Sequence, residues 1–246
     1  CRGDIVGANT KALTLSAGAT LEFDASQAAS PESQNYCLKL GTGYYQTAAL
    51  VCNGIESNHC TVTSNSGGGN GRIYNPPSYA YLTGEMRCAY TDFSYLGTST
   101  LDNGCDIGTA NVSLTNCTFD NCGRFIFFTG NDATHKMVIR NCTTTNTLAS
   151  SAMSIPNTVA TSECKFNSFD KTVVFNGCAT WEVEDNYFAT AWSGSAAASM
   201  GTFERNFVRL PPAVDYPTYR STDPKDCYML SDYDTLNGRC LGLDCT

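Results

Sequence analysis

Five short lines of sequence between residues 112 and 208 decide the fold of this chain. They read VSLTNCTF (112–119), MVIRNCTT (137–144), VATSECKF (159–166), WEVEDNYF (181–188) and GTFERNFV (201–208). In each line, apolar or small residues alternate with polar ones, and a Cys or Asn follows. These Cys and Asn residues form a column that extends upstream, with steps of 28, 29, 25, 22, 22 and 20 residues. The column consists of Cys60, Cys88, Cys117, Cys142, Cys164, Asn186 and Asn206. Such a period indicates a solenoid of stacked repeats.

The alternation within each repeat predicts one strand per coil of a parallel β-helix. Coils stack about 4.8 Å apart, so seven columns predict a stack ~34 Å tall. The position two residues after the column is apolar or aromatic in six of seven repeats and is predicted to point inward; it holds Val62, Tyr90, Phe119, Thr144, Phe166, Phe188 and Val208. The position before the column is polar and predicted to point outward; it holds Arg87, Asn116, Asn141, Glu163, Asp185 and Arg205. We expect Asp185 to pair with Arg205 across coils, and Glu163 to repel Asp185.

The composition is that of one elongated all-β domain. The chain has 246 residues, 42% hydrophobic and only 15% charged. No apolar run approaches the 18 residues of a membrane span. The net charge of −8 argues against a nucleic-acid partner, because binding phosphates requires a basic surface.

Three regions follow from the pattern. Residues 1–36 are predicted to form an N-terminal cap or first coil, with one amphipathic strand pattern from Ala12 to Phe23. Residues 37–210 are predicted to form the coils. The pattern stops at Pro211 and Pro212, so residues 211–246 are predicted to form an extended Cys-rich tail laid along the solenoid.

Cysteine usage indicates an oxidising compartment. The fourteen cysteines are even in number, scattered, and contain no C-x-x-C pair, which favours disulfides over metal or redox sites. The disulfide candidates are Cys1, Cys37, Cys52, Cys60, Cys88, Cys105, Cys117, Cys122, Cys142, Cys164, Cys178, Cys227, Cys240 and Cys245. The connectivity stays open, although stacked neighbours such as Cys117 and Cys142 are expected to lie close together. The alternative is an unbridged inward ladder, since free Cys packs as a small hydrophobe.

Three sequons agree with a secreted protein. Asn111, Asn116 and Asn141 each begin an N-x-S/T triplet and are candidate N-glycosylation sites. If Cys117 and Cys142 point inward, strand alternation turns the three asparagines outward. Asn116 and Asn141 are then expected on adjacent coils, one above the other. The alternative is that Asn simply suits turns.

The stacked Asn186 and Asn206, the N-C-T and N-Y-F turns and the coil length resemble the right-handed parallel β-helix of the pectin-lyase-like superfamily. The resemblance covers about Cys60 to Leu210 and concerns architecture. It implies an extracellular protein and favours contact with carbohydrate, but fold alone does not assign a function.

A catalytic cluster of the kinds that this resemblance implies is hard to find. The polygalacturonase-like motifs Asn-Thr-Asp, Asp-Asp and Gly-His-Gly do not occur. A lyase-like site needs clustered Asp ligands for Ca²⁺ and a basic residue. The candidates are Asp92, Asp120 and Asp170, with Arg124 and Lys171 close by. The alternative is that these are turn residues with solvated partners.

Two classes of function therefore remain. The favoured one is a non-catalytic, disulfide-stabilised extracellular glycoprotein that builds a surface layer, filament or adhesin, through self-association or contact with other glycoproteins or polysaccharide. The alternative is a lyase or glycoside hydrolase acting on acidic polysaccharide. No cofactor is expected; apart from the lyase-like candidates, Asp232 and Asp234 suggest Ca²⁺, but Leu236 fills the next ligand position. A weaker hypothesis is ice or surface binding by threonines, which cluster in one predicted coil (Thr143, Thr144, Thr145 and Thr147).

Overall fold

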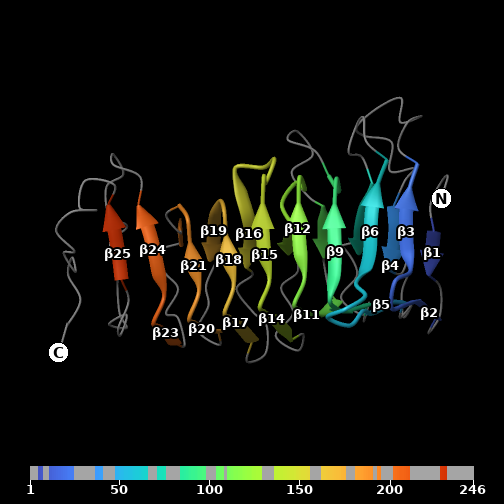
Figure 1. Cartoon of the computed structure of the whole chain (residues 1–246), viewed down its shortest axis with the longest axis horizontal. Helices are drawn as coiled ribbons and strands as arrows, with labels where there is room; N and C mark the ends of the chain where they lie inside the picture. The colour runs from blue at the N-terminus through green and yellow to red at the C-terminus, as the bar shows by residue number, and fades with distance from the viewer. Residues whose placement is uncertain are drawn as a thin grey trace.

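A computed structural model describes fourteen segments of the chain. These are residues 5–7, 11–24, 37–40, 48–65, 71–75, 84–97, 104–107, 110–128, 136–155, 162–175, 181–190, 193–194, 202–210 and 228–231. Within them the secondary structure is all β, and the strands form three parallel sheets (Figure 1). None of the segments described contains a helix long and apolar enough to cross a membrane.

Each sheet takes every third strand of the chain. The first sheet, A, contains β1 (Ile5–Gly7), β4 (Cys37–Leu40), β7 (Arg72–Asn75), β10 (Cys105–Ile107), β13 (Ile126–Phe128), β16 (Ser151–Ile155), β19 (Thr172–Phe175) and β22 (Ser193–Gly194). Sheet B contains β2 (Lys11–Ser16), β5 (Ala48–Asn53), β8 (Gly84–Ala89), β11 (Ala110–Thr115), β14 (Met137–Arg140), β17 (Ser162–Lys165), β20 (Trp181–Glu184) and β23 (Thr202–Glu204). Sheet C contains β3 (Thr20–Phe23), β6 (Cys60–Ser64), β9 (Thr91–Ser94), β12 (Thr118–Asp120), β15 (Thr143–Thr145), β18 (Ser168–Phe169), β21 (Tyr187–Phe188), β24 (Phe207–Leu210) and β25 (Tyr228–Ser231).

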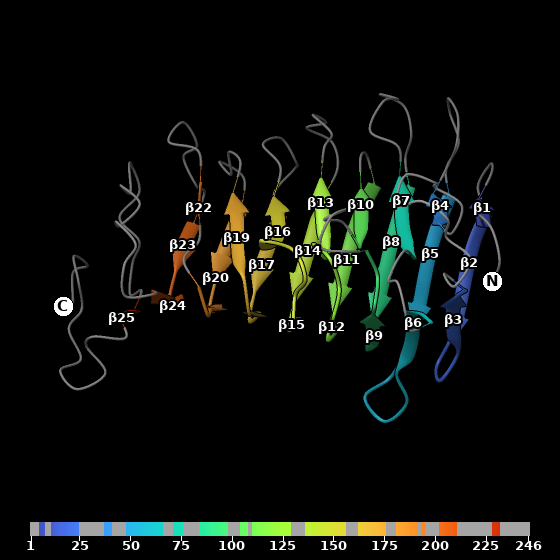
Figure 2. The same ribbon diagram turned by 90° about the horizontal axis from the view of Figure 1, so that it is seen from above.

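The chain therefore winds through A, B and C in turn, as a parallel β-solenoid does (Figure 2). We number the coils so that coil 1 is β1–β3 and coil 8 is β22–β24. The prediction of a solenoid of parallel strands is confirmed, but the prediction of one strand per coil is wrong, because each coil contributes three. The predicted strand from Ala12 to Phe23 is likewise two strands, β2 and β3, separated by a turn at Gly18 with φ +77°.

The end of the chain is only partly described. Strand β25 pairs in parallel with β24, so Tyr228–Ser231 adds one more strand to sheet C. The rest of the predicted tail, including Asp232 and Asp234, lies outside the described residues.

The register corrects the predicted column in two coils. Cys88 pairs with Cys52 and Leu114 in sheet B, and Cys164 pairs with Ile139 and Val183 in the same inward row. The true column lies at the turn between sheets B and C and consists of Cys60, Thr91, Cys117, Cys142, Asn167, Asn186 and Asn206. In both misassigned coils, a cysteine three residues earlier in the chain resembles the true member, because it too points inward.

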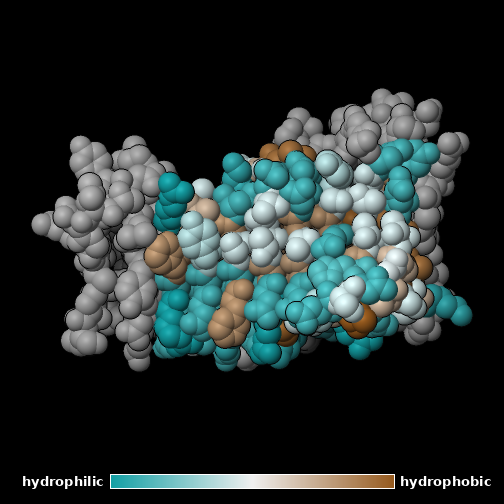
Figure 3. Space-filling view, in the orientation of Figure 1, coloured by the Kyte–Doolittle hydropathy of each residue, from teal (hydrophilic) through white to brown (hydrophobic). Residues whose placement is uncertain are grey.

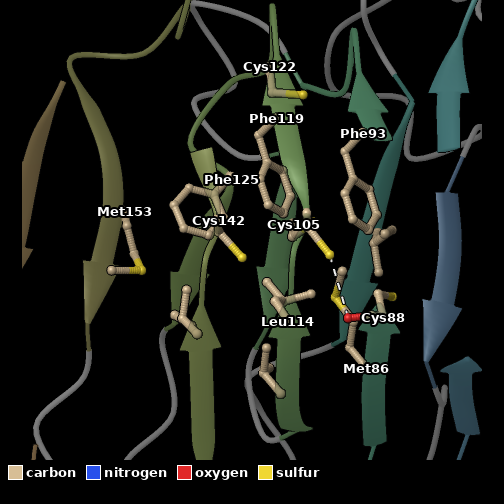
Figure 4. Close-up of a cluster of buried hydrophobic side chains, with 14 of the residues drawn as sticks. Met86, Cys88, Phe93, Cys105, Leu114, Phe119, Cys122, Phe125, Cys142 and Met153 are labelled. Atoms are coloured by element: carbon tan, nitrogen blue, oxygen red, sulfur yellow. Dashed lines mark hydrogen bonds between the residues drawn. The ribbon is translucent and has the colours of Figure 1, made fainter. Parts of the chain in front are cut away.

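The same correction moves the inward aromatic stack. Phe93 and Phe169 take the places that the sequence pattern gave to Tyr90 and Phe166, and Phe166 is 57% exposed. The rings of Phe93 and Phe119 stack face to face, with centroids 4.6 Å apart (Figure 4). At the next coil the stack holds Thr144, and Phe125 from the start of sheet A fills the gap by packing on Phe119 and Phe169. Burial of such rings is the main stabilising contribution to the core.

In coils 3 to 8, the residue before the column makes the turn between sheets B and C. It adopts a left-handed backbone in Tyr90, Asn116, Asn141, Phe166, Asp185 and Arg205, with φ between 44° and 60°. Asn and Asp tolerate this conformation better than other residues, because their short side chains bond locally. All six residues of the predicted outward row are exposed or half-buried, but Arg87 and Glu163 point outward from sheet B and do not lie at the turn. Because Tyr90 and Phe166 replace them, the row is not polar throughout.

The buried asparagines of the column form a hydrogen-bonded ladder in coils 6 to 8. The amide oxygens of Asn167, Asn186 and Asn206 each accept a backbone N–H from the column residue one coil earlier, at 2.8, 3.0 and 3.0 Å. Their amide nitrogens donate to backbone carbonyls at 2.7 to 3.0 Å. All three side chains are at least 98% buried. The ladder thus satisfies turn groups that would otherwise be buried without a partner.

The eight cysteines whose side chains are described are buried and form no disulfide. For Cys52, Cys60, Cys88, Cys105, Cys117, Cys122, Cys142 and Cys164 the structure therefore has the unbridged inward arrangement in place of the predicted disulfides. Burial raises the pKa of the Cys122 thiol to about 12, so this thiol stays protonated at neutral pH. Cys1, Cys178, Cys227, Cys240, Cys245 and the side chain of Cys37 lie outside the described part.

Candidate binding face

The outer surface of sheet C carries two rows of hydroxyl and carboxyl side chains. The first row consists of Thr20, Thr61, Asp92, Thr118, Thr143 and Ser168. The second row consists of Glu22, Thr63, Ser94, Asp120 and Thr145. We call these two rows the hydroxyl face. In Figure 3 the side of the molecule that carries sheet C has a pale, mildly polar band between more hydrophilic regions.

Thr143, Thr144 and Thr145 lie together in β15, as the predicted cluster requires, but threonines also repeat at one position over several coils. Thr20, Thr61, Thr118 and Thr143 occupy one row across five coils, because the strands are in register. Neighbouring coils place row members about 4.8 Å apart, and the two rows lie ~7 Å apart along each strand. The result is a regular array on a flat parallel sheet.

Asp92 is the centre of a hydrogen-bonded group on the first row. Thr118 Oγ1 donates to Asp92 Oδ1 at 2.7 Å, and His59 Nδ1 lies 3.1 Å from the same oxygen. The His59 ring lies beside the Tyr90 ring, with centroids 5.7 Å apart. The Asp92 and His59 side chains are 44% and 32% exposed, so both are accessible to a ligand.

Asp120, one of the catalytic candidates, is held by neighbours from the next coil. Its Oδ1 accepts bonds from Thr145 Oγ1 and Asn146 Nδ2, both at 2.8 Å, and its Oδ2 accepts one from Asn121. The hydrogen bonds from Asn146 and Thr145 lower the pKa of Asp120. Asp120 is thus an ionised acceptor at neutral pH, which suits positioning and not proton donation.

Asp170 serves the turn that follows β15. Its Oδ1 accepts from Thr144 Oγ1 and Thr147 Oγ1, both at 2.6 Å, and its Oδ2 accepts from the Thr147 backbone N–H at 2.7 Å. This arrangement supports the interpretation of Asp170 as a turn residue. The bond from Thr144 Oγ1 to Asp170 also gives this buried hydroxyl a hydrogen-bond partner.

The structure does not gather the remaining catalytic candidates. Arg124 Nε donates to Ser151 Oγ at 2.9 Å, toward sheet A. Lys171 is exposed in a bend after β18. No group of three or more His, Cys, Asp or Glu residues that could hold a metal ion occurs in the segments the structure describes.

Aromatic residues border the hydroxyl face in coil 3. Tyr90 precedes β9 and Tyr95 follows it, and both have a left-handed backbone, with φ of 44° and 55°. The equivalent turns of coils 4 and 5 hold asparagine at both ends, at Asn116, Asn121, Asn141 and Asn146. Tyr95 is 41% exposed. In coil 3, therefore, tyrosine adopts the left-handed conformation at both ends of β9, although asparagine favours it more, and an aromatic ring lies at each end of the strand.

The sequon asparagines lie where the alternation predicts. Asn111 and Asn141 are exposed, and Asn116 is half-buried. The pairing of β12 with β15 places Asn116 and Asn141 on adjacent coils, as expected, and the Asn116 N–H donates to the Arg140 carbonyl. Both residues have positive φ, so their turn geometry accounts for asparagine at these positions with or without a glycan.

Ion pairs cover the neighbouring edge of sheet B in coils 5 to 8. The predicted pair is present: Arg205 donates to both oxygens of Asp185 at 2.8 Å. The predicted repulsion between Glu163 and Asp185 is absent, because Glu163 lies beside Glu182 in register and pairs with Arg140 and Lys136. Charged contacts of this exposed kind contribute little to stability individually.

Comparison with known proteins adds nothing to this geometry, since no family model, no curated protein and no solved structure matches the chain.

Two residues of the turn column, Thr91 and Asn167, and most of the hydroxyl face were not predicted from the sequence. The signal that could have identified the two column residues is a tetrapeptide of turn residue, column residue, outward residue and inward residue. Its inward residue is apolar in six of the seven coils, and Thr144 is the exception. The tetrapeptide recurs as HCTV (59–62), YTDF (90–93), NCTF (116–119), NCTT (141–144), FNSF (166–169), DNYF (185–188) and RNFV (205–208).

Proposed function

We propose that this protein is a non-catalytic extracellular solenoid that serves as a structural or adhesive building block, and that the hydroxyl face is its contact surface. The proposal includes a right-handed coil, an N-terminal cap, and secretion with use of at least one of the three sequons. The right hand is the one that parallel crossover connections overwhelmingly adopt.

The observation that best supports the proposal is that side chains of the hydroxyl face form hydrogen bonds with one another. Thr118 donates to Asp92, and Thr145 donates to Asp120, so hydroxyls of one coil hold carboxylates of the preceding coil. Such bonds fix the side chains before any ligand arrives, which reduces the entropy cost of binding an extended partner. A carboxyl that acts as a general acid near neutral pH needs instead a raised pKa, whereas hydrogen bonds from Asn146 and Thr145 lower the pKa of Asp120.

The chemistry of the face favours a neutral polyhydroxylated partner. Thr and Ser hydroxyls both donate and accept, so they match sugar hydroxyl groups. Tyr90, Tyr95 and His59 add rings at the border, and such amphipathic rings pack against partly apolar faces while their polar atoms bond. The carboxylates of Asp92 and Asp120 and the net charge of −8 disfavour acidic polysaccharides.

A co-sedimentation assay with insoluble neutral polysaccharides tests the contact surface. We expect the chain to bind at low ionic strength and in salt, and we expect Thr118→Val to weaken binding by about tenfold, or ~1.4 kcal/mol. The matched control is Thr115→Val, which places the same change on sheet B. Equal binding by both variants would contradict the assignment of the face.

Electron microscopy of the native protein tests the building-block role separately. Ordered layers or filaments are expected at high protein concentration, because head-to-tail contacts between solenoid ends do not close. Dispersed monomers at all concentrations would rule out the filament form and leave only the adhesive one. Release of unsaturated or reducing ends from a polysaccharide, lost in an Asp120→Asn variant, would overturn the non-catalytic assignment.

A further inference from the structure

The turn column changes its chemistry halfway along the stack. In coils 6 to 8 it holds Asn167, Asn186 and Asn206, whose amides bond both to each other and to the backbone. In coils 4 and 5 the same position holds Cys117 and Cys142. A thiol is a weak hydrogen-bond donor and a weak acceptor, so it cannot replace the strong donor and acceptor groups of an amide. Each thiol donates to a carbonyl two residues earlier in its own coil, at 3.4 Å, and Cys117 Sγ also lies 3.5 Å from the Cys88 carbonyl of the preceding coil.

Weak thiol bonds of this kind also occur at Cys60, whose register partner is Thr91, so they do not explain why two consecutive coils carry cysteine here. Their positions do suggest an explanation. Thr118 pairs directly with Thr143, so the cysteines that precede them lie on adjacent coils at the ladder spacing of about 4.8 Å. This spacing falls within the 4.4–6.8 Å range of Cα separations that a disulfide usually spans. The two thiols are buried and within hydrogen-bonding reach of each other.

A second pair of cysteines, in sheet B, also lies at equivalent positions of adjacent coils. Cys52 and Cys88 are direct register partners in β5 and β8, and both point into the core. Their thiols are also within hydrogen-bonding reach. Cys88 lies among the buried side chains near Phe93 in Figure 4.

Two other cysteines provide a natural contrast. Cys164 lies between Ile139 and Val183 in its row, and Cys60 has Thr91 as its register partner. Neither has a cysteine at the equivalent position of an adjacent coil. Among the cysteines whose side chains the structure describes, register pairs of this kind therefore occur at two places and are not a general property of buried cysteine in this fold.

We infer that, when the folded chain is oxidised, Cys52 joins Cys88 and Cys117 joins Cys142, in disulfides that link coil 2 to coil 3 and coil 4 to coil 5. The bonds form by thiol–disulfide exchange with a small-molecule disulfide of the glutathione type. One protein thiolate attacks a sulfur of that disulfide and releases one small thiol, and the partner cysteine then displaces the second. Each pair loses two protons and two electrons, and each small-molecule disulfide is reduced to two thiols.

The location of the pairs gives them a role. They link the N-terminal coils covalently, where the column lacks asparagine, while the Asn ladder links coils 6 to 8 through hydrogen bonds. Closing the loops between paired cysteines restricts the unfolded chain, which stabilises the folded state. The presence of these bonds in the native material rests on the proposed extracellular setting, whereas their formation in a redox buffer does not.

Disulfide mapping of the full-length chain tests the inference. The reduced protein is equilibrated with reduced and oxidised glutathione in mild urea, so that local opening admits the oxidant. The remaining thiols are alkylated after denaturation, and unreduced peptides are identified by mass spectrometry. We expect two linked peptide pairs, Cys52 with Cys88 and Cys117 with Cys142, and alkylated Cys60 and Cys164.

Two variants make the outcome decisive. Cys117→Ser is expected to lose one linked pair and leave Cys142 alkylated, whereas Cys164→Ser is expected to retain both pairs. Hydrogen exchange of the strand amides checks that each variant remains folded. Alkylation of all four paired cysteines after equilibration, or linkage to other partners in the folded protein, would overturn the inference. Linked pairs in a chain that neither binds polysaccharide nor assembles would leave this inference intact and refute the proposed function.

Discussion

Replacing Asn186 with alanine removes the central member of the Asn ladder. The amide oxygen of Asn186 accepts the Asn167 N–H at 3.0 Å, and its nitrogen donates to the Cys164 carbonyl at 2.7 Å. Both backbone groups lie in a coil whose column side chain is 98% buried, so water does not replace the lost bonds. A buried polar group that loses its partner costs about 1–3 kcal/mol. Two such groups give a predicted loss of about 2–6 kcal/mol.

This loss is large relative to the whole stability of an ordinary domain, about 5–15 kcal/mol. Each coil contacts only its neighbours, so the effect is expected to concentrate around coils 6 to 8. Urea unfolding measures the total change, and native-state hydrogen exchange of the Asn167 amide measures the local one. A local loss of about 3 kcal/mol corresponds to roughly 100-fold faster exchange.

Ser168→Ala is the matched control for this substitution. Ser168 lies next to the ladder but on the outer face of sheet C, half-buried, so we expect a change below about 0.5 kcal/mol. Asn186→Cys is an informative intermediate, because cysteine occupies the same position in coils 4 and 5. Exchange at Asn167 that is unchanged in Asn186→Ala would refute the view that the ladder stabilises the turn.

Three further predictions follow from single positions. A Cβ on Gly54 would lie 2.1 Å from the Tyr90 carbonyl oxygen, so Gly54→Ala is expected to destabilise the fold by about 1–3 kcal/mol in urea unfolding; a neutral change would contradict that close contact. Phe166 is exposed with φ 60°, so Phe166→Asn should raise the free energy of unfolding, measured in urea, by up to about 1 kcal/mol, whereas the buried Phe169→Asn should lower it. Hydrogen bonds from Arg205 lower the pKa of Asp185, so its stabilising contribution is present above the unfolded pKa of about 3.9 and disappears as the pH falls through the lower folded value. The stability gap between wild type and Asp185→Asn should therefore be largest at neutral pH and close in acid; a gap that widens in acid would refute this linkage.

The repeating lines of sequence contain enough information to predict the fold class. Alternation in Trp181–Glu184 and the stacking of Asn186 on Asn206 follow directly from a period that brings equivalent residues together. The inward position of Phe119 and Phe188 follows from the same alternation. These features are local, because strand period and coil spacing are set by backbone geometry.

The register of coils 3 and 6 could not be obtained from the same pattern. Cys88 and Cys164 point inward from sheet B, three residues before the true turn residues Thr91 and Asn167, and both positions are buried. The difference lies in one left-handed residue between two short strands, at Tyr90 and Phe166. Neither residue type favours that conformation, so the turn residue itself gives no signal there.

The hydroxyl face could not be predicted from the sequence for a related reason. Thr61, Thr118 and Thr143 lie in one row only once the register is known, because coils differ in length and the spacing between these threonines is irregular. The bonds that Asp120 and Asp170 receive come from residues about 25 positions away in the sequence. The local sequence around a carboxylate does not tell whether it serves a turn or a binding site. The distinction depends on the hydrogen-bond partners that the neighbouring coil provides.

The Asn ladder has a mechanical consequence for a molecule of this shape. Hydrogen bonds between strands run along the stack, so a pull along that axis is borne by whichever boundary between coils is weakest. In sheet C the pairing strands shorten from the five residues of β6 to the two residues of β18 and β21. Asn167, Asn186 and Asn206 stand at these thin boundaries and add side-chain links between them. The ladder therefore equalises the tensile strength of the stack, placing extra connections where the backbone supplies the fewest.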